Sequence, residues 1–177
     1  MDNNAKNRIM QYAFFTAVAA TVYFLESMAV RMLPLPFLRI GLANVIIVYL
    51  LMKREFVFAF TVNIMKTVIG GLISFTLLSP ATLISICGGV GSLLVMWLLL
   101  MSRIRFSIIG ISIAGAVVHN IIQILVVRWV VIPKDSVLNL LPVLMLIGIV
   151  TGFVTGMIAH ELYEKLEGSK ECEGKPA

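Results

Sequence analysis

The sequence predicts an all-α integral membrane protein built as a bundle of six transmembrane helices. The chain has 177 residues, of which 60% are hydrophobic and 13% are charged, and its mean hydropathy is +1.03. A soluble domain of this length does not need so much apolar surface, whereas a membrane bundle does. The alternating pattern of a membrane β-barrel is absent from the sequence, and helices satisfy their backbone hydrogen bonds within lipid.

Six apolar segments approach the ~20 residues that a helix needs to cross the hydrocarbon core. The second segment is short, and we expect it to be tilted or to begin within the stretch 34–39. We expect the segments to form one domain, 1–163, followed by a short polar cytoplasmic tail, 164–177. The expected helices are Ile9 to Val30, Arg39 to Met52, Phe56 to Leu78, Pro80 to Met101, Phe106 to Val131 and Val137 to Tyr163.

Basic residues in the loops predict the orientation of the bundle. If six helices cross, four basic regions fall on one side, and the positive-inside rule makes that side cytoplasmic. Both termini are then inside, and the chain is a multi-pass protein of the plasma membrane. Topology also accounts for the net charge of +5, so we expect no nucleic-acid partner. The basic residues of this side are Lys6, Arg8, Lys53, Arg54, Arg103, Arg105, Lys165, Lys170 and Lys175.

Glycine recurs at every fourth position in the last segment, at 148, 152 and 156. Such spacing places the glycines on one helix face, where a neighbouring backbone can approach closely. We interpret it chiefly as internal packing of the bundle. The alternative is a docking surface for another membrane subunit.

Lys66 lies in the middle of the third segment, where a charged side chain costs roughly 2.5–3.5 kcal/mol on insertion scales. Asn63, Lys66, Thr67 and Gly70 follow the spacing i, i+3, i+4, i+7, which is one helical face. That face cannot contact lipid cheaply, so we expect it to point into the bundle.

More polar residues gather in other segments. One account is a structural network, in which Lys66 pairs with Glu26. The other is a ligand pocket open to the outer face, and because cations outnumber acids there, its ligand would be anionic or polar with an apolar body. The predicted substrate-binding residues are Lys66, Asn63, His119, Asn120, Gln123, Asn44, Arg39 and Glu26.

Catalytic signatures are missing from the sequence. Asp2 and Asp135 are the only aspartates and neither lies in a core segment, so there is no aspartate pair of the kind that binds magnesium and diphosphate. No glycine-rich phosphate loop is present. Cys87 and Cys172 lie in separate regions, which predicts neither a disulfide nor a metal site. We therefore expect no enzyme activity, no cofactor and no metal in this chain.

Several stretches resemble one membrane family. They are Leu-Pro-Leu-Pro-Phe from residue 33, Arg-Ile-Gly-Leu-Ala-Asn from residue 39, His-Asn-x-x-Gln from residue 119, and Leu-Pro-Val-Leu from residue 141. Together they resemble the Gx transporter family, which is also named heptaprenyl diphosphate synthase component I. Arg39 stands where lysine is expected, which keeps the charge.

The resemblance implies a six-helix protein similar to the substrate-binding S-components of energy-coupling factor (ECF) transporters. Such proteins bind a solute from outside, and the loop around 34–39 would close over it. They dock on a coupling membrane subunit that works with ATPases, and this implies docking through Ala13, Ala17 and Ala20 of the first helix. Membrane lipids would cover the remaining surface.

Two other functions remain open at this point. The synthase name implies a non-catalytic membrane accessory subunit of polyprenyl (heptaprenyl) diphosphate or quinone synthesis. The polar residues alone also fit a stand-alone ion-coupled carrier, in which Glu26, Lys66 and His119 relay protons.

Overall fold

The computed structural model describes residues 3–31, 41–103, 106–131 and 133–173, with side chains for 6–29, 41–103, 106–131 and 133–166. Every regular element within these ranges is helical, so the all-α prediction is confirmed for them. The elements are α1 (Asn3–Arg31), α2 (Asn44–Met52), α3 (Phe56–Ile73), α4 (Pro80–Met101), α5 (Ile108–Val126), a π-helical turn η1 (Val127–Val131), a 3₁₀ helix η2 (Asp135–Leu140) and α6 (Leu141–Glu173).

Five helices, all except α2, are long and apolar enough to cross a membrane. This indicates a multi-pass membrane protein. Helix α2 has nine residues, which span only about 13 Å. Five elements therefore meet the length of a full span where the sequence predicted six, and the part of the second segment before residue 41 lies outside the described residues.

Several helix boundaries differ from those predicted. Helix α2 begins at Asn44, after a turn at 41–43 that includes Gly41 with a φ of 81°. Helix α3 ends at Ile73, five residues early, and Phe75 adopts a φ of 54° in the turn that follows. A side chain in that left-handed conformation cannot continue a helix. Helix α6 continues beyond Tyr163 to Glu173, so most of the predicted tail is helical.

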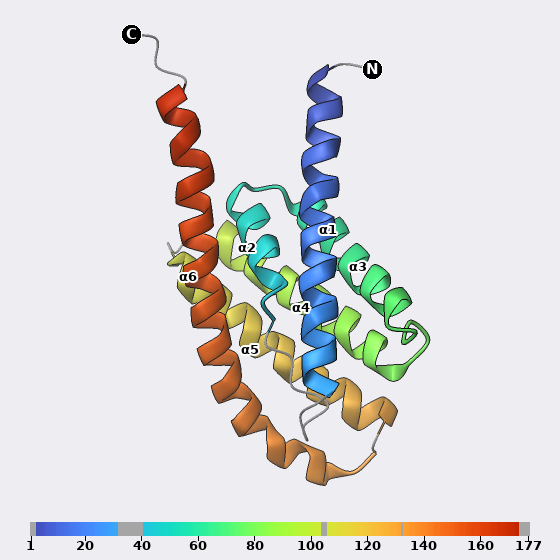
Figure 1. Ribbon diagram of the computed structural model, residues 1–177. Helices are drawn as coiled ribbons and strands as arrows, with labels where there is room; N and C mark the ends of the chain where they lie inside the picture. The colour runs from blue at the N-terminus through green and yellow to red at the C-terminus, as the bar shows by residue number, and fades with distance from the viewer. Residues whose placement is uncertain (1–2, 32–40, 104–105, 132, 174–177) are drawn as a thin grey trace.

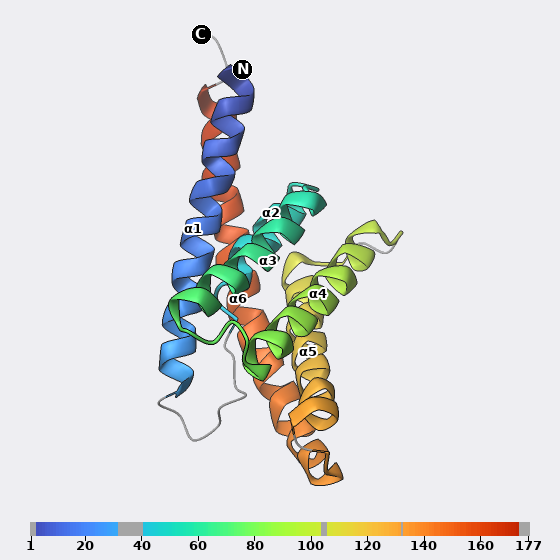
Figure 2. The same cartoon turned by 90° about the vertical axis from the view of Figure 1, so that its right-hand side faces the viewer.

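The helices form an open bundle with α1 and α6 along two flanks (Figure 1). The amino end of α1 and the carboxyl end of α6 lie at the same end of the molecule, because the two helices run in opposite directions. Helix α5 packs between α4 and α6, while α1 packs mainly against α3. Helices α3 and α4 are steeply inclined to α1 and α6, as the turned view shows (Figure 2).

The short helix α2 occupies the centre of this arrangement and contacts each of the other five α-helices. All seven residues from Val45 to Leu51 are buried. A helix that is apolar on every side is buried rather than amphipathic. Its Tyr49 ring lies 5.4 Å from the Phe15 ring of α1 and 6.3 Å from the Tyr163 ring of α6, measured between centroids. Helix α2 therefore joins two flanking helices that do not contact each other within the described residues.

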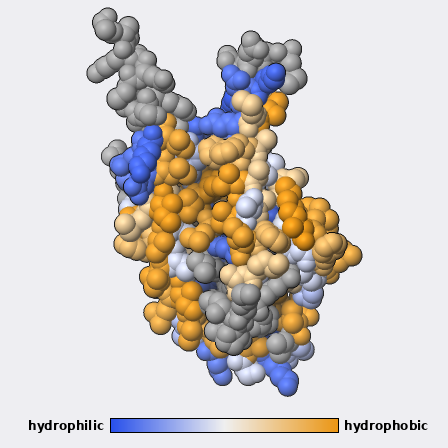
Figure 3. Space-filling view, viewed as in Figure 1, coloured by the Kyte–Doolittle hydropathy of each residue, from blue (hydrophilic) through white to orange (hydrophobic). Residues whose placement is uncertain are grey.

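The surface carries a broad apolar belt. In the face drawn in Figure 3, hydrophobic residues cover the middle of the molecule, and hydrophilic residues gather toward its two ends. Large apolar side chains on α1 and α6 are exposed, among them Phe14, Leu146 and Val150. In a soluble protein such a surface would drive association, whereas in a bilayer it meets lipid.

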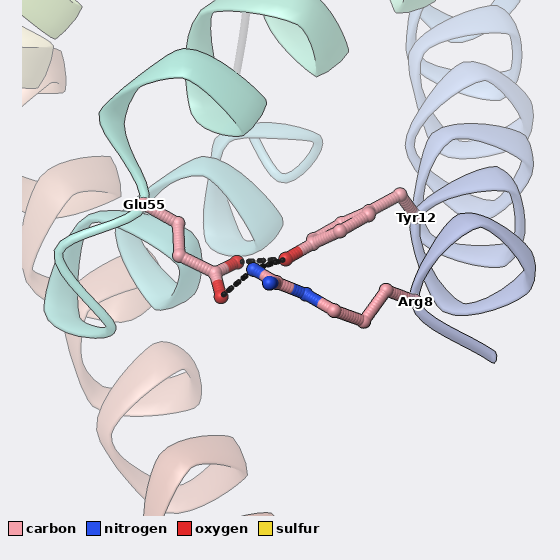
Figure 4. Close-up of polar contacts among 3 residues, drawn as sticks. All are labelled: Arg8, Tyr12 and Glu55. Atoms are coloured by element: carbon pink, nitrogen blue, oxygen red, sulfur yellow. Dashed lines mark hydrogen bonds and ion pairs between the residues drawn. The ribbon is translucent and has the colours of Figure 1, made fainter. Parts of the chain in front are cut away.

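A polar cluster of Arg8, Tyr12 and Glu55 connects α1 with the start of α3 (Figure 4). The Tyr12 hydroxyl donates a 2.8 Å hydrogen bond to Glu55 and accepts one from Arg8, whose guanidinium lies 3.8 Å from the same carboxylate. The Tyr12 ring also stacks on Phe58, with 3.5 Å between centroids. These contacts hold the amino half of α1 beside the turn between α2 and α3.

The glycine row of α6 packs against α5. A Cβ atom on Gly152 would lie 2.6 Å from the Cα atom of Ile113, and one on Gly156 would lie 2.9 Å from the Cα atom of Ile109. Gly148 faces Asn120 and the backbone of Val117 in the same way. The prediction that this row serves internal packing is confirmed, because the space beside each glycine is filled by this chain.

We predict that Gly152→Ala destabilises the protein by about 1–3 kcal/mol, because two backbones would have to separate. Gly110→Ala is the matched control on the facing helix, since a Cβ there meets nothing within 4 Å. Thermal unfolding of both variants in detergent would be compared with the parent. Equal midpoints for the two variants would contradict the packing described above.

Candidate functional site

The polar face of α3 points into the bundle. Asn63, Lys66, Thr67 and Gly70 are all buried, as their helical spacing predicts. Gly70 lies beneath the ring of Tyr23 from α1, which is close enough that a Cβ atom would overlap it. The absence of a side chain at Gly70 therefore lets α1 pack next to Lys66.

Lys66 is held by the first residue of α2. The side chain of Lys66 is only 4% exposed, and its Nζ donates a 2.5 Å hydrogen bond to Oδ1 of Asn44. A buried ammonium group needs such an acceptor, since an uncompensated charge is costly to bury. The contact places one positive charge at the amino end of α2. Because the helix dipole favours anions at this end, the acceptor oxygen of Asn44, and not the dipole, stabilises the charge.

Glu26 approaches the same end of α2 from α1. Its carboxylate accepts a hydrogen bond from the backbone N–H of Leu42, in the turn that precedes the helix. Glu26 and Lys66 line one cavity, together with Tyr23, Thr67 and Ser85. A carboxylate and an ammonium group therefore face the same small cavity.

The polar residues of α5 reach this region from the opposite side. His119, Asn120 and Gln123 are buried. His119 Nε2 lies 2.9 Å from Gln123 Nε2, and Asn120 donates a 2.7 Å hydrogen bond to the carbonyl of Leu144 in α6. His119 packs on Gly88 of α4, where a Cβ would lie 3.1 Å from the imidazole ring. The imidazole consequently sits between α4 and the start of α2.

Two cavities meet at this point. The first lies on the Lys66 side, and the second is bordered by α2, α5 and α6. Gly41, Asn44 and His119 border both. Each cavity has a volume of about 20 Å³, which is room for one or two water molecules. Because the two cavities share these three wall residues, together they form one chamber around the start of α2.

Two buried amides beside the chamber have unused hydrogen-bonding capacity. Both polar side-chain atoms of Asn63, and Oε1 of Gln123, have no partner among the residues that the structure describes. Each residue is 2% exposed. An unsatisfied buried group costs about 1–3 kcal/mol. The Asn63 amide lies over Gly89, where a Cβ would be 2.8 Å away, and Gly89 borders the first cavity.

The structure brings most of the predicted site residues together. Lys66, Asn44, Glu26, His119 and Asn120 border one or both cavities, whereas Asn63 and Gln123 lie immediately behind the walls. Arg39 lies outside the described residues.

Residues outside the cavities complete the comparison with the predicted site. Arg128 borders neither cavity and instead forms an ion pair with Asp135, outside the long helices. In the predicted docking stripe, Ala13 and Ala17 are exposed, and Ala20 is buried within the chain.

Sequence reasoning missed several residues that border the cavities. Tyr23 lies one turn before Glu26 on α1, and Ser85 lies one turn before Gly88 and Gly89 on α4, so helical spacing from residues already noticed could have found them. The same spacing applies to Ser112, seven residues before His119, and to Thr151 and Thr155, each three residues after a glycine of the α6 row. Ser112 and Thr155 are hydrogen-bonded to each other across α5 and α6, with 3.0 Å between oxygens.

Metal-ligating residues do not gather here. In the described part of the chain, no group of three or more His, Cys, Asp or Glu side chains lies close enough to hold a metal ion. The chemistry that the site offers is binding by one buried cation, one acid, one imidazole and several amides and hydroxyls.

Comparison with known families adds one finding. The family model for heptaprenyl diphosphate synthase component I matches residues 15–162. The chain belongs to this family. The matched range includes both cavities and all of the predicted binding residues. No significant match was found among curated proteins or among solved structures.

The family's description refers to one component of a synthase, that is, to a protein that works with partners. Its match confirms the resemblance that the sequence motifs carry. The similarity to ECF S-components, by contrast, stays a prediction.

A double-mutant cycle tests the Lys66–Asn44 contact. Asn44→Ala should cost about 1–3 kcal/mol of stability, because it removes the acceptor of a buried charge. Lys66→Met should cost less, since it removes the charge as well. In the Lys66→Met background, Asn44→Ala should then have a smaller effect than in the parent. Additive effects on the unfolding midpoint would show that the two side chains do not interact.

Proposed function

We propose that this protein is a membrane-embedded binding and uptake component for a small anionic or polar solute with an apolar body, comparable to an ECF S-component. The single observation that carries the proposal is Lys66, a buried cation that borders a cavity inside an apolar bundle. A charge at such a depth is costly. Its position beside a cavity, and not in a filled packing interface, favours a role in binding.

The groups around Lys66 define what the chamber binds. Lys66 supplies the positive charge for an anionic group of the solute, and Asn44, which Lys66 contacts, holds it in place. Glu26, which borders the same cavity, orients Lys66. His119 and Asn120 supply hydrogen bonds to polar atoms of the solute, together with the amides of Asn63, next to Gly89, and Gln123, next to His119. Arg39, which lies outside the described residues, stays a predicted binding residue.

The proposal places six segments across the plasma membrane with both termini in the cytoplasm. The amino end of α1 and the carboxyl end of α6 lie at one end of the molecule, and the connection from α2 to α3 lies toward that end (Figure 1). The positive-inside rule makes that end cytoplasmic. In this proposal, the second predicted segment, which contains α2, is the second crossing. Labelling of Lys134→Cys but not Lys165→Cys by a membrane-impermeant maleimide in intact cells is the expected result, and the reverse would overturn this orientation.

Transport requires partners in this scheme. Ala13 and Ala17 lie exposed on α1, where small side chains would let the helix of a coupling membrane subunit approach closely. ATPases bound to that subunit would drive the cycle. Lipid covers the rest of the apolar belt.

Retention of the natural ligand tests the pocket. Native mass spectrometry of the gently purified parent should detect a bound small molecule, which Lys66→Ala and His119→Ala should lose or reduce by about tenfold or more, because each removes a binding group. Lys165→Ala is the control, since Lys165 is exposed and pairs only with Glu161 among the described contacts. Undiminished retention by both pocket variants, in folded protein, would falsify the assignment.

The family match favours a second function, a non-catalytic membrane accessory subunit of polyprenyl diphosphate or quinone synthesis. A soluble catalytic subunit would then bind the cytoplasmic end, where α1 and α6 extend beyond the other helices (Figure 2).

Co-purification distinguishes the two functions. The uptake proposal predicts that the protein, isolated in mild detergent, carries a membrane coupling subunit and ATPases. A soluble prenyltransferase in place of these proteins would support the accessory role and count against uptake.

A further inference from the structure

A third cavity extends the chamber into the apolar half of the bundle. It lies between α2, α4 and α5 and is lined entirely by apolar side chains: Val48, Leu51, Met52, Leu100, Ile108 and Ile111. Val48 also borders the second cavity, which in turn shares Asn44 and His119 with the first. The three cavities therefore follow one another, from charged through polar to apolar.

Helix α2 forms the common wall of this series. Asn44, Val48, Leu51 and Met52 border the cavities in order, and they follow the spacing i, i+4, i+7, i+8 of one helical face. The row from Asn44 to Met52 covers about 10–12 Å at the helical rise. An extended carbon chain advances about 1.25 Å per bond, so the row matches roughly eight or nine bonds.

We propose that the chamber binds a short amphiphile, with one anionic head at Lys66 and a linear apolar tail that lies along α2 toward Leu51 and Met52. This inference rests on the proposed binding function and adds the shape and direction of the ligand. Among the described residues, Lys66 is the only Lys or Arg that lines the first cavity, and it fixes the position of the head. The apolar lining of the third cavity fixes the position of the tail.

The polar groups of the middle cavity do not obstruct a tail. The hydroxyls of Ser112 and Thr155 are bonded to each other, and the hydroxyl of Thr151 is bonded to the carbonyl of Gly148. Since these groups are already satisfied inside the chain, an apolar chain can pass them without leaving a polar atom unpaired.

Two methionines provide the adaptable part of the path. Met96 borders the middle cavity, and Met52 borders the apolar one. The apolar cavity has a volume of only about 10 Å³, so a tail must displace side chains to enter. Unbranched thioether side chains repack readily. Gly115 provides the space that the Met96 side chain occupies, because a Cβ there would lie 2.6 Å from both Cγ and Sδ of Met96.

The first test measures how the affinity of the parent protein depends on the length of the ligand's carbon chain. Equilibrium dialysis of the protein in lipid nanodiscs, corrected with empty nanodiscs, would measure butyrate, octanoate, hexadecanoate and octyl phosphate. Octanoate should bind at least about tenfold more tightly than butyrate, because more methylene groups are buried. Hexadecanoate should gain little more than octanoate, since its chain exceeds the row. The phosphate and carboxylate arms show which anion the head prefers.

Three variants test the position of the head and the position of the tail separately. Gly115→Ala pushes Met96 into the path, so it should weaken octanoate about fivefold or more and leave butyrate within about twofold. Gly110→Ala, on the same helix with open space around it, should change neither. Lys66→Met should weaken both acids by about tenfold or more, because each loses its charge partner.

The outcomes distinguish this inference from the proposed function. The tail assignment is overturned by equal binding of butyrate and octanoate, by affinity that rises steadily to hexadecanoate, or by octanoate binding that Gly115→Ala leaves unchanged. It is also overturned if the parent binds none of the anionic amphiphiles. If the parent binds both acids equally and Lys66→Met abolishes that binding, the pocket proposal stands and the tail site is rejected. Binding that no variant alters would reject the pocket as well.

Discussion

The hydrogen bond from Lys66 to Asn44 is the contact on which the interior of this protein depends. A positive charge inside an apolar bundle must have an acceptor, and Asn44 is the first residue of α2. The contact therefore fixes the level at which α2 begins as well as the position of the charge. Because the turn before α2 also donates to Glu26 of α1, the acid is held at the same level. The same two contacts therefore hold both the polar centre and the central helix in place.

Helix α2 divides the interior of the bundle into a polar half and an apolar half. Its seven consecutive buried residues are apolar on all sides, and the cavity beside Val48 and Leu51 is lined by apolar side chains. Its amino end carries Asn44 and faces Lys66 and His119. A full-length amphipathic helix at this position would have needed a polar stripe along its whole length. A short apolar helix with one polar end confines the polar chamber to one half of the bundle.

The parts of the site that follow from helical spacing could be predicted from the sequence. The inward faces of Lys66 on α3 and His119 on α5 follow from residues three and four apart, as does the packing role of Gly152. What the sequence does not reveal is which faces meet. Asn44 as the acceptor of Lys66 depends on where α2 begins, which was predicted at Arg39 and is observed at Asn44. The approach of Ser112 to Thr155 likewise depends on the pairing of α5 with α6.

The unused hydrogen-bonding groups beside the chamber argue that it is adapted to more than stability. Asn63 and Gln123 are each buried with at least one polar atom unpaired among the described residues. Each such group costs about 1–3 kcal/mol, and apolar side chains of similar volume would avoid the cost. If stability were the whole purpose, these groups would be expected in filled interfaces with partners. They lie instead behind Gly89 and His119, two residues of the cavity wall. A polar ligand or ordered water that reached these amides would supply the missing partners.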